Sequence, residues 1–437
     1  MGVSRQAVKN AKDRFSLRPL RSLRLCVSVW LWLVFVFPAA AQTKLEAGVG
    51  KADLTPPIGT PLAGYGARVG GPSSGIHDPL EARAVILANG AEKIALVAVD
   101  HLGFDHAMVE RVRAASEKSG VASDHIFVMS SHTHAGGGAY LEIFPELAGK
   151  YDPKIRAFYE QRAAEAVLAA SRSLRPARIA IGAGACAGLS RFRSSWPPGG
   201  GPIDPEVGVI RIDDAVAGKP LAVLMNFAAH PTVLSARNFQ FSADYVGYAR
   251  QALERFLGGG VMALFANGAQ GTVAPRPFRG ADEWARAENM GLILAAEVFK
   301  VVHMIEPRDS VEIRLARTPL ALKPQMPAGF PPGRSLGDTY PSEMSGLVFD
   351  NRFAFVTIPG ELSSIINAQI KDRGKLLGLE RTFLLGLTND AVGYIITEDE
   401  YRHGTYESRV SFFGPQFGGT VMNEAFLILE KLKPKGS

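Results

Sequence analysis

Cysteine is the scarcest residue type in this 437-residue chain, which has only Cys26 and Cys186. Cys26 lies in an N-terminal apolar segment that we expect to be removed, so Cys186 would remain alone. An internal disulfide is therefore excluded from the mature chain. With 47% hydrophobic residues, a chain of this length can rely on a large buried core instead.

Signatures of several common site types are also missing. No G-x-x-x-x-G-K-[ST] segment occurs, and the glycines at 64, 66, 70 and 71 are not followed by a helix pattern, so nothing indicates a phosphate-binding loop. G-x-S-x-G occurs at 71–75 (GPSSG) and 333–337 (GRSLG), but neither segment follows a strand pattern and opens a helix, so no nucleophile elbow is indicated, which argues against a serine hydrolase. No Asp-His pair follows His132 and His134, which excludes the metallo-β-lactamase pattern.

The N-terminal apolar run, residues 25–37, is shorter than the roughly 20 residues that a membrane-spanning helix needs. Seven basic residues precede it, and Pro38 and three alanines follow it. This order is typical of a cleavable secretory signal peptide, residues 1–41, with an uncleaved anchor as the alternative. We therefore expect an exported protein, either periplasmic or secreted.

The positive charge of the chain belongs to the same segment. Its seven Lys/Arg residues and one acid, Asp13, give a net charge of +6, which equals the formal charge of the whole chain. The remaining 42–437 are close to neutral, and nothing in the charge indicates a nucleic-acid partner.

From about residue 45, short apolar or β-branched runs alternate with amphipathic helix patterns, which predicts an α/β fold with mixed β-sheets at the centre surrounded by α-helices. No repeat or linker divides residues 42–437, so we expect one catalytic domain. The strands are expected at 83–88, 93–99, 126–131, 179–184, 207–212, 221–227, 261–266, 311–315, 353–358 and 382–385. The helices are expected at 105–118, 154–173, 242–256 and 282–305 and from Glu361 onward.

Two stretches rich in proline and glycine, 193–205 and 323–337, interrupt this pattern. Such loops often form binding sites, although an ordinary surface loop is an equal alternative.

Three histidines follow apolar strand patterns. His132 and His134 are two residues apart at the end of one predicted strand, so their side chains can share a face. His230 directly follows another strand. Each of them also has a structural interpretation as a buried, hydrogen-bonded histidine, but histidines at equivalent strand ends are suited to a shared zinc ion.

Two further strand ends carry polar groups. Glu361 follows a Pro-Gly pair and is placed to open a helix, where an acid stabilises the helix dipole. Tyr394 lies in a turn, where a core or hydrogen-bonded tyrosine is the ordinary interpretation. Spacing alone assigns neither residue to a metal.

Taken together, these segments resemble the catalytic domain of the neutral (non-lysosomal) ceramidase family, from residue 47 to about 415. The resemblance is carried by residues 47–57 (AGVGKADLTPP), 61–66 (PLAGYG), 76–80 (IHDPL), 132–136 (HTHAG), 227–231 (FAAHP), 244–249 (DYVGYA), 359–361 (PGE) and 394–401 (YIITEDEY).

The resemblance implies a Zn²⁺ ion held by His132, His230, Glu361 and Tyr394. It also implies that His134 lies beside the reacting group and that Arg191 helps to bind the polar head of the substrate. Asp244 is a candidate partner for a ligand histidine, with capping of its own helix as the alternative.

The sequence departs from the family at its serine nucleophile. Where the family has a segment resembling G-D-x-S-P, this chain has 271–275 (GTVAP), with Ala274 at the serine position and Thr272 at the acid position. The family's C-terminal β-domain has no counterpart before residue 437. Ala274 cannot attack a carbonyl. Thr272 as a substitute nucleophile is the less favoured alternative to zinc-activated water.

The sequence therefore predicts a zinc-dependent hydrolase that cleaves an N-acyl, ceramide-like amide with zinc-activated water. In this hypothesis His134 transfers protons, and Tyr394 and Arg191 stabilise the oxyanion. The alternatives are a non-catalytic metal- or lipid-binding homologue and a zinc esterase or lactonase. The expected partner is a small or lipid N-acyl substrate, with peripheral membrane contact also considered.

Overall fold

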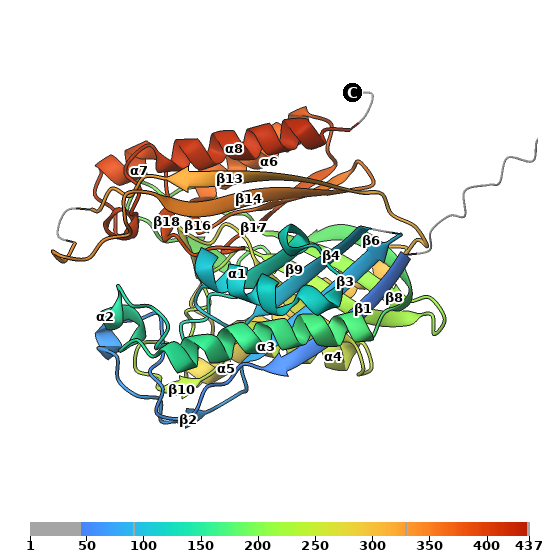
Figure 1. Ribbon diagram of the computed structural model, residues 1–437, viewed down its shortest axis with the longest axis horizontal. Coiled ribbons are helices and arrows are strands. Elements are labelled where there is room, and N and C mark those ends of the chain that lie inside the picture. The colour runs from blue at the N-terminus through green and yellow to red at the C-terminus, as the bar shows by residue number, and fades with distance from the viewer. Residues whose placement is uncertain (1–44, 91, 328–329, 435–437) are drawn as a thin grey trace, which may run out of the picture. The chain divides into compact units, whose positions relative to one another are not determined.

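A mixed eight-stranded sheet is the central element of the computed structural model, which describes residues 45–90, 92–327 and 330–434 (Figure 1). β11 pairs parallel with β9, and β4 pairs parallel with β5, whereas the strands between them are antiparallel. In spatial order the strands are β11 (Met262–Asn267), β9 (Lys219–Phe227), β8 (Glu206–Asp214), β6 (Arg175–Ala185), β1 (Leu45–Asp53), β3 (Glu81–Asn89), β4 (Glu92–Val99) and β5 (Ile126–Ser130).

A second sheet of four strands packs against one face of the first. Its order is β13 (Ile313–Leu322), β14 (Tyr340–Phe349), β15 (Phe353–Thr357) and β17 (Arg381–Leu385). Leu87 on β3 belongs to the same buried cluster as Phe355 on β15 and Phe383 on β17, so this cluster fills the space between the sheets.

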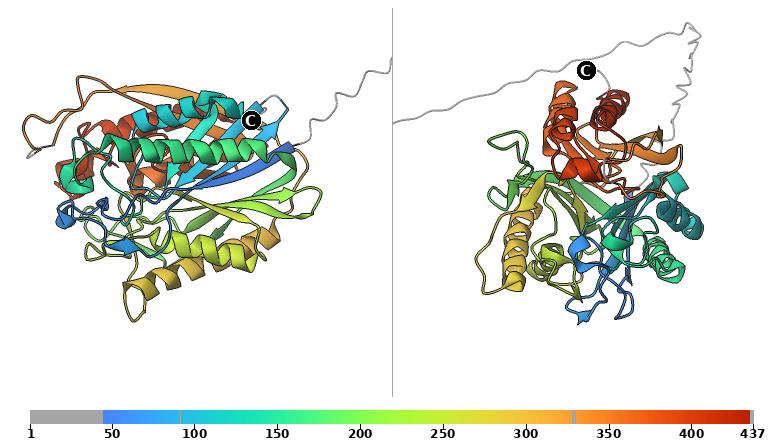
Figure 2. Two further views of the ribbon diagram at one scale, coloured as in Figure 1. Left: turned by 60° about the horizontal axis from the view of Figure 1, so that its bottom comes forward. Right: turned by 90° about the vertical axis from the view of Figure 1, so that its left-hand side faces the viewer.

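Helices cover the outer face of each sheet. Residues of α1 (His106–Ala115), α3 (Pro153–Arg172), α4 (Asp244–Phe256) and α5 (Glu283–Met304) form one core with the eight-stranded sheet. Residues of α6 (Ser364–Leu376) and α8 (Phe417–Leu432) form another with the four-stranded sheet. The order of layers is therefore helices, sheet, sheet, helices (Figure 2).

The apolar runs of the sequence follow from this layering. Along β3, Ala84 and Ile86 face the helices, whereas Val85 and Leu87 face the second sheet. Because successive side chains point to opposite faces, a strand covered on both faces needs apolar residues at consecutive positions.

The expected α/β fold with mixed sheets is confirmed, and so is the cap at Asp105, whereas the helix ends at Ala115, before the predicted end near Lys118. The Asp105 side chain accepts a hydrogen bond from Met108 N at the start of α1 (2.8 Å). Gly120 adopts a left-handed φ of +70° after the 3₁₀ turn η2 (Glu117–Ser119) that follows α1.

The prediction that Glu361 opens a helix is wrong. Glu361 lies in the short strand β16 (Glu361–Leu362), and the helix α6 begins at Ser364 with Ser363 as its N-cap. Sequence patterns also missed β14, which follows a proline- and glycine-rich stretch, and α8. Both bury apolar residues in the core under α6.

Shorter elements connect these layers. The two-residue strands β16 and β18 (Tyr394–Ile395) pair in parallel, and β7 (Ser190–Phe192) pairs with β12 (Val273–Pro275). The remaining elements are β2 (Gly75–Ile76), β10 (Gln240–Phe241), α2 (Pro145–Ala148), α7 (Glu398–Arg402) and the 3₁₀ turns η1 (Gly66–Arg68), η3 (Ser123–His125) and η4 (Glu407–Val410).

The predicted signal peptide, residues 1–41, lies outside the described residues. Residues Thr43–Ser437 form one compact unit. Within the part of the chain that the structure describes, no helix combines the length and apolar character needed to cross a membrane.

Candidate metal centre

His132 is held in a fixed orientation at the end of β5. Its backbone φ of +68° lies in the left-handed region, which is costly for a residue with a side chain. Two contacts hold this conformation: His132 N donates to His101 O (2.9 Å), and Nδ1 lies 2.6 Å from Leu102 O. An Nδ1–H donated to this carbonyl leaves the Nε2 lone pair free to bind a metal.

His230 has the same arrangement at the end of β9. It is fully buried, and its Nδ1 lies 2.7 Å from Gln270 O. Its Nε2 therefore also presents a lone pair on the side away from the backbone. Both histidines follow parallel pairs of strands, β4–β5 and β11–β9, where the chain leaves the sheet at the carboxyl edge.

Both Nε2 atoms meet a single carboxylate. The Glu361 Oε2 atom lies 3.2 Å from His132 Nε2 and 2.9 Å from His230 Nε2. Burial disfavours ionisation of Glu361, but the two imidazoles hold its pKa well below the ordinary value. The structure thus brings three of the four predicted ligands into contact.

Tyr394, the fourth predicted ligand, lies opposite Glu361 in the parallel pair of β16 and β18. Its side chain is buried, and burial together with Glu361 raises its pKa well above 10. Tyr394 therefore stays a protonated phenol in the protein as described.

Arg193 is the site residue that sequence reasoning missed. Its Nη2 donates to Tyr394 Oη (2.7 Å) and to Gly271 O (2.9 Å), and it lies 3.3 Å from His230 Nε2. The only signal was its position at the start of the glycine-rich stretch 193–205. Arg191, which the sequence predicted to bind the polar head of the substrate and to stabilise the oxyanion, is exposed on β7. It lies opposite Ala274 in the pairing of β7 with β12.

His134 lies on the open side of this cluster. Its Nε2 is 3.3 Å from His132 Nε2, and its buried Nδ1 has no hydrogen-bond partner among the described residues. Burial, with the neighbouring His132 and His230, holds its pKa well below 6.5. His134 is therefore a neutral imidazole that can accept a proton.

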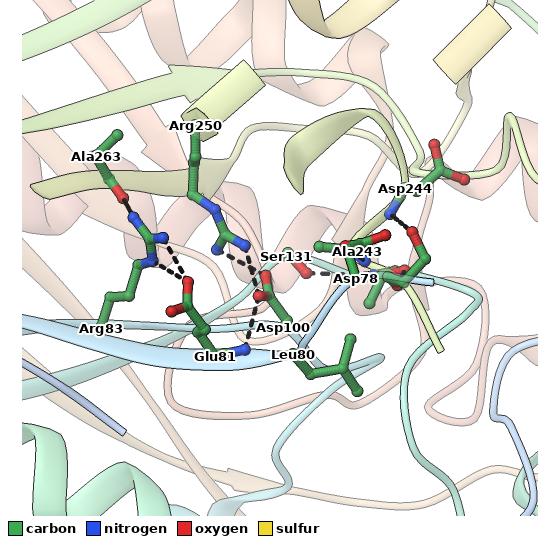
Figure 3. Close-up of polar contacts among 12 residues, drawn as sticks. Asp78, Leu80, Glu81, Arg83, Asp100, Ser131, Ala243, Asp244, Arg250 and Ala263 are labelled. Atoms are coloured by element: carbon green, nitrogen blue, oxygen red, sulfur yellow. Dashed lines mark hydrogen bonds and ion pairs between the residues drawn. The ribbon is translucent and has the colours of Figure 1, made fainter. Parts of the chain in front are cut away.

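A buried ion pair lies at the end of β4, the strand next to β5, which His132 follows (Figure 3). Asp100, at the end of β4, accepts both Nη groups of Arg250 (2.8 and 2.6 Å) and the backbone N–H of Glu81 (2.9 Å). Asp100 directly precedes His101, whose carbonyl accepts the His132 N–H. The pair therefore fixes the backbone on which the first histidine depends.

Thr272 and Ala274, in the segment where the family has its serine, are not placed as nucleophiles. Thr272 is fully buried, and its Oγ1 lies 3.0 Å from Ser364 Oγ and accepts Ser364 N (3.0 Å). Its hydroxyl therefore serves the start of α6. Ala274 is buried in β12 and has no functional group.

Asp244 contacts neither histidine through a hydrogen bond of its carboxylate. It accepts the backbone N–H groups of Leu234 (2.9 Å) and Tyr245 (2.6 Å). It thus ties the start of α4, where its own φ is +55°, to the loop that follows His230. Burial raises the pKa of Asp244 to about 7.

An apolar cavity of about 100 Å³ opens beside the cluster, and its lining includes both His132 and Glu361. Its apolar walls are formed by Leu102, Tyr140, Leu141, Phe144, Leu147, Leu387, Val410 and Phe412. A larger groove of about 780 Å³ runs along α6 but contains none of the predicted site residues. Its walls are lined by ion pairs such as Lys371–Asp204, so the smaller cavity is the one suited to hydrocarbon.

The donor set fits a zinc ion. Ligand atoms 2.0–2.2 Å from a tetrahedral ion are about 3.3–3.6 Å apart. The His132–His134 and His132–Glu361 separations, 3.3 and 3.2 Å, are close to that spacing, and the His230–Glu361 separation of 2.9 Å is shorter. The three histidines place ring nitrogens within 4.8 Å of one another, so a trio with His134 is an alternative to the predicted set with Glu361 and Tyr394.

Comparisons with known proteins bear on the family and the fold. The family described as neutral/alkaline non-lysosomal ceramidase, N-terminal, matches residues 45–282. The neutral ceramidases of Mycobacterium tuberculosis and of rice are 27% and 25% identical over 49% and 52% of the chain. These matches cover 36% and 32% of the relatives, so the chain aligns with about a third of their length.

Solved structures show the same fold. The neutral ceramidase from Pseudomonas aeruginosa superposes with a TM-score of 0.78 at 19% identity, covering 90% of this chain and 75% of that one. A structure of a ceramidase complexed with C2 gives 0.74 at 19% identity, covering 90% and 77%. The family match contains all three histidines, whereas Glu361 and Tyr394 lie beyond it and reach the cluster only through the fold.

Proposed function

Because this chain belongs to the neutral/alkaline non-lysosomal ceramidase family, we propose that it is an exported zinc-dependent hydrolase of N-acyl, ceramide-like amides. One observation carries the proposal: two imidazole Nε2 atoms, from two separate strand ends, lie 3.2 and 2.9 Å from the same oxygen of Glu361. Two lone pairs and a carboxylate directed at one point are the donor set of a catalytic zinc site.

The residues that would hold the ion are His132, His230, Glu361 and Tyr394. When bound, zinc supplies a Lewis acid and lowers the pKa of a water molecule from 15.7 to about 7. Ala274 offers no side-chain nucleophile, so water attacks the amide carbon directly. The C–N bond then breaks, giving a carboxylic acid and an amine.

His134 is the group that moves the proton. As a neutral imidazole whose Nε2 faces the cluster, it accepts a proton from the attacking water. It then returns that proton to the nitrogen of the leaving amine, which is a poor leaving group until it is protonated.

Tyr394 and Arg193 form the oxyanion-stabilising pair. Arg193 donates to Tyr394 Oη, so the phenol's own O–H hydrogen remains free for the developing negative charge. The Arg193 guanidinium adds a fixed positive charge that needs no reorganisation during the reaction. Arg193 thereby takes the role that the sequence assigned to Arg191.

The apolar cavity beside His132 and Glu361 supports a hydrocarbon-bearing substrate. The near-neutral charge of residues 42–437 offers no basis for nucleic-acid binding, and export rests on the signal-like pattern of residues 1–41. An apolar cavity and export from the cytoplasm are both consistent with a lipid substrate taken from a membrane surface.

The test is a substrate panel assayed on purified protein before and after treatment with a chelator. N-acyl sphingoid amides should be cleaved, activity should disappear on chelation, and zinc should restore it. Cleavage of esters or lactones alone would favour the esterase alternative. Because Ala274 replaces a serine, the non-catalytic alternative has specific support, and bound zinc without turnover on the whole panel would establish it.

A further inference from the structure

Arg68 is a buried cation that the proposed chemistry does not use. It ends η1, and only 5% of its surface is exposed. Its hydrogen bonds go to three backbone carbonyl oxygens, not to a carboxylate. Burying a guanidinium without an anionic partner is costly, and here burial lowers its pKa to about 10. The burial of this guanidinium therefore calls for a structural explanation.

The carbonyls that Arg68 contacts belong to separate segments of the chain. Its Nη1 donates to Ala63 O (3.1 Å) and to His134 O (2.5 Å), and its Nη2 donates to Ser235 O (3.3 Å). One of these carbonyls lies two residues after His132, and another lies five residues after His230. One planar guanidinium thus connects the two loops that carry the histidine ligands.

Tyr65 makes a second connection between the same loops. Its ring lies against the His134 ring, with the ring centroids 4.7 Å apart, and its Oη donates to Leu234 O (2.9 Å). The Arg68 Cζ atom lies 4.8 Å from the Tyr65 ring centroid, so the two side chains also stabilise each other. Gly64 permits this approach, because a Cβ there would lie 2.6 Å from His134 Cγ.

We infer that Arg68 and Tyr65 are positioning residues that hold the 132–134 segment and the loop after His230 at the spacing one metal ion requires. The inference rests on the proposed function for the presence of that ion. We call these two side chains the clamp. The clamp contacts backbone carbonyls and the face of the His134 ring, so its proposed role is to fix the positions of the histidine side chains and not to bind the substrate.

The test measures zinc affinity by competition with a chromogenic chelator, on wild type and on Arg68→Met, Arg68→Lys and Tyr65→Phe. Partners that orient metal ligands typically contribute about 10–100-fold in affinity, so Arg68→Met should raise the zinc Kd by that factor. Arg68→Lys, which keeps a donor, should recover part of the loss. Tyr65→Phe keeps the ring against His134 and should have the smallest effect.

Arg211→Met is the matched control. Arg211 also donates to backbone carbonyls, those of Val302 (2.7 Å) and Ile305 (3.4 Å), and unlike Arg68 it pairs with a carboxylate, that of Asp213 (2.7 Å). It lies on β8 and contacts neither histidine loop through these bonds. It should lower Tm and leave the zinc Kd unchanged. A folded Arg68→Met protein with wild-type zinc Kd would overturn the inference. If Arg68→Met does not fold, wild-type Kd values in both Arg68→Lys and Tyr65→Phe would overturn it equally.

Amide hydrogen exchange of the metal-free proteins separates this inference from the proposed function. Exchange in residues 132–136 and 231–235 should be faster in Arg68→Met than in wild type, and unchanged in Arg211→Met. A wild-type protein that binds no zinc would refute the proposed function, and the exchange rates alone would then decide whether the clamp exists. Unchanged exchange in both segments would refute it.

Discussion

Two clusters of histidine and carboxylate side chains come within metal-binding distance in the described part of the chain, and they differ in how their carboxylates are paired. One is the His132–His134–His230 cluster with Glu361. The other is formed by His106, Glu110 and Glu343, whose ligand atoms also lie within 4.8 Å of one another.

At the second cluster, guanidinium groups already donate hydrogen bonds to the buried carboxylate of Glu343. Glu343 accepts Arg113 Nη2 (2.6 Å), Arg317 Nε (2.9 Å) and Asn389 Nδ2 (2.7 Å). Burial disfavours its ionisation, yet these arginines lower its pKa to about 2. A cation placed there would be repelled by two guanidinium groups.

At the first cluster, the partners of the carboxylate are imidazoles, which carry lone pairs and no obligatory charge. The neighbouring Arg193 donates through Nη2 to Tyr394 and to a carbonyl, and although this atom lies 3.3 Å from His230 Nε2, no guanidinium donates to the Glu361 carboxylate among the contacts described above. Proximity of ligand-type residues is therefore not sufficient for a metal site. What matters is whether their acceptor atoms are still available.

The strongest way to break this comparison is to remove one histidine from each cluster. His132→Ala should eliminate both bound zinc and turnover, because one of the converging Nε2 atoms is lost. His106→Ala should retain both. Elemental analysis alongside the amide assay measures the effect, and loss of zinc in His106→Ala would reverse the assignment of the two clusters.

Glu343→Gln should lower the free energy of unfolding by about 3–5 kcal/mol, because it leaves the buried Arg113 without its buried anion. Zinc content should stay at the wild-type level. Urea denaturation followed by circular dichroism measures the change. A loss of zinc without a loss of stability would show that Glu343 is a ligand and not an ion-pair partner.

Arg193→Met should lower kcat by roughly 10²–10³-fold, the range found when one oxyanion-stabilising donor is removed. Zinc should remain bound, because its proposed ligands are intact. Arg191→Met is the matched control, and since Arg191 is exposed it should change kcat little. If the Arg191 variant shows the larger loss, the prediction from the sequence was correct and the placement of Arg193 is misleading.

Asp390 gives the second cluster a pH dependence. It accepts Ser342 Oγ (2.7 Å) and the backbone N–H of His106 (3.0 Å), and burial raises its pKa from 3.8 to about 7. The native state therefore binds more protons than the unfolded state between pH 4 and 7. Stability should fall as pH rises through this window, by at most about 1.4 kcal/mol per pH unit.

Asp390→Asn should make that decline shallower, as measured by denaturant unfolding from pH 4 to pH 8; Asp244, whose pKa is also raised to about 7, should maintain the remainder. Asp309→Asn changes an exposed carboxylate paired with Arg178 and serves as the control. An Asp390→Asn protein with the same slope as wild type would contradict the assignment.

The smallest effect is expected for Thr272→Val. Loss of its hydrogen bonds to Ser364 should lower stability by about 1 kcal/mol. Turnover should stay within about threefold of wild type, as expected if Thr272 is not the nucleophile. A hundredfold fall in kcat with zinc still bound would instead make the hydroxyl part of the reaction.

The sequence singled out the three histidines that the fold brings together, because each follows an apolar strand, and the end of a strand can be predicted from local pattern. It could not distinguish Arg193 from Arg191. Which arginine enters the site depends on the path of the chain after β7, and that path is set by contacts with Gly271 and Tyr394, distant in sequence. Glu361 was expected at a helix start for the same reason: local pattern favours a cap, while pairing with β18 makes a strand.

By itself, the sequence determined the α/β class with mixed sheets, most of the buried strands and the family, because hydrophobic periodicity and ordered motifs are local properties of the chain. Only the tertiary structure decided which polar side chains share one space. Glu361 Oε2 lies 3.2 Å from His132 Nε2, although more than two hundred residues separate the two in sequence. Only the stacking of the two sheets brings them together. No local interaction encodes that distance, which arises from packing the apolar faces of the sheets together.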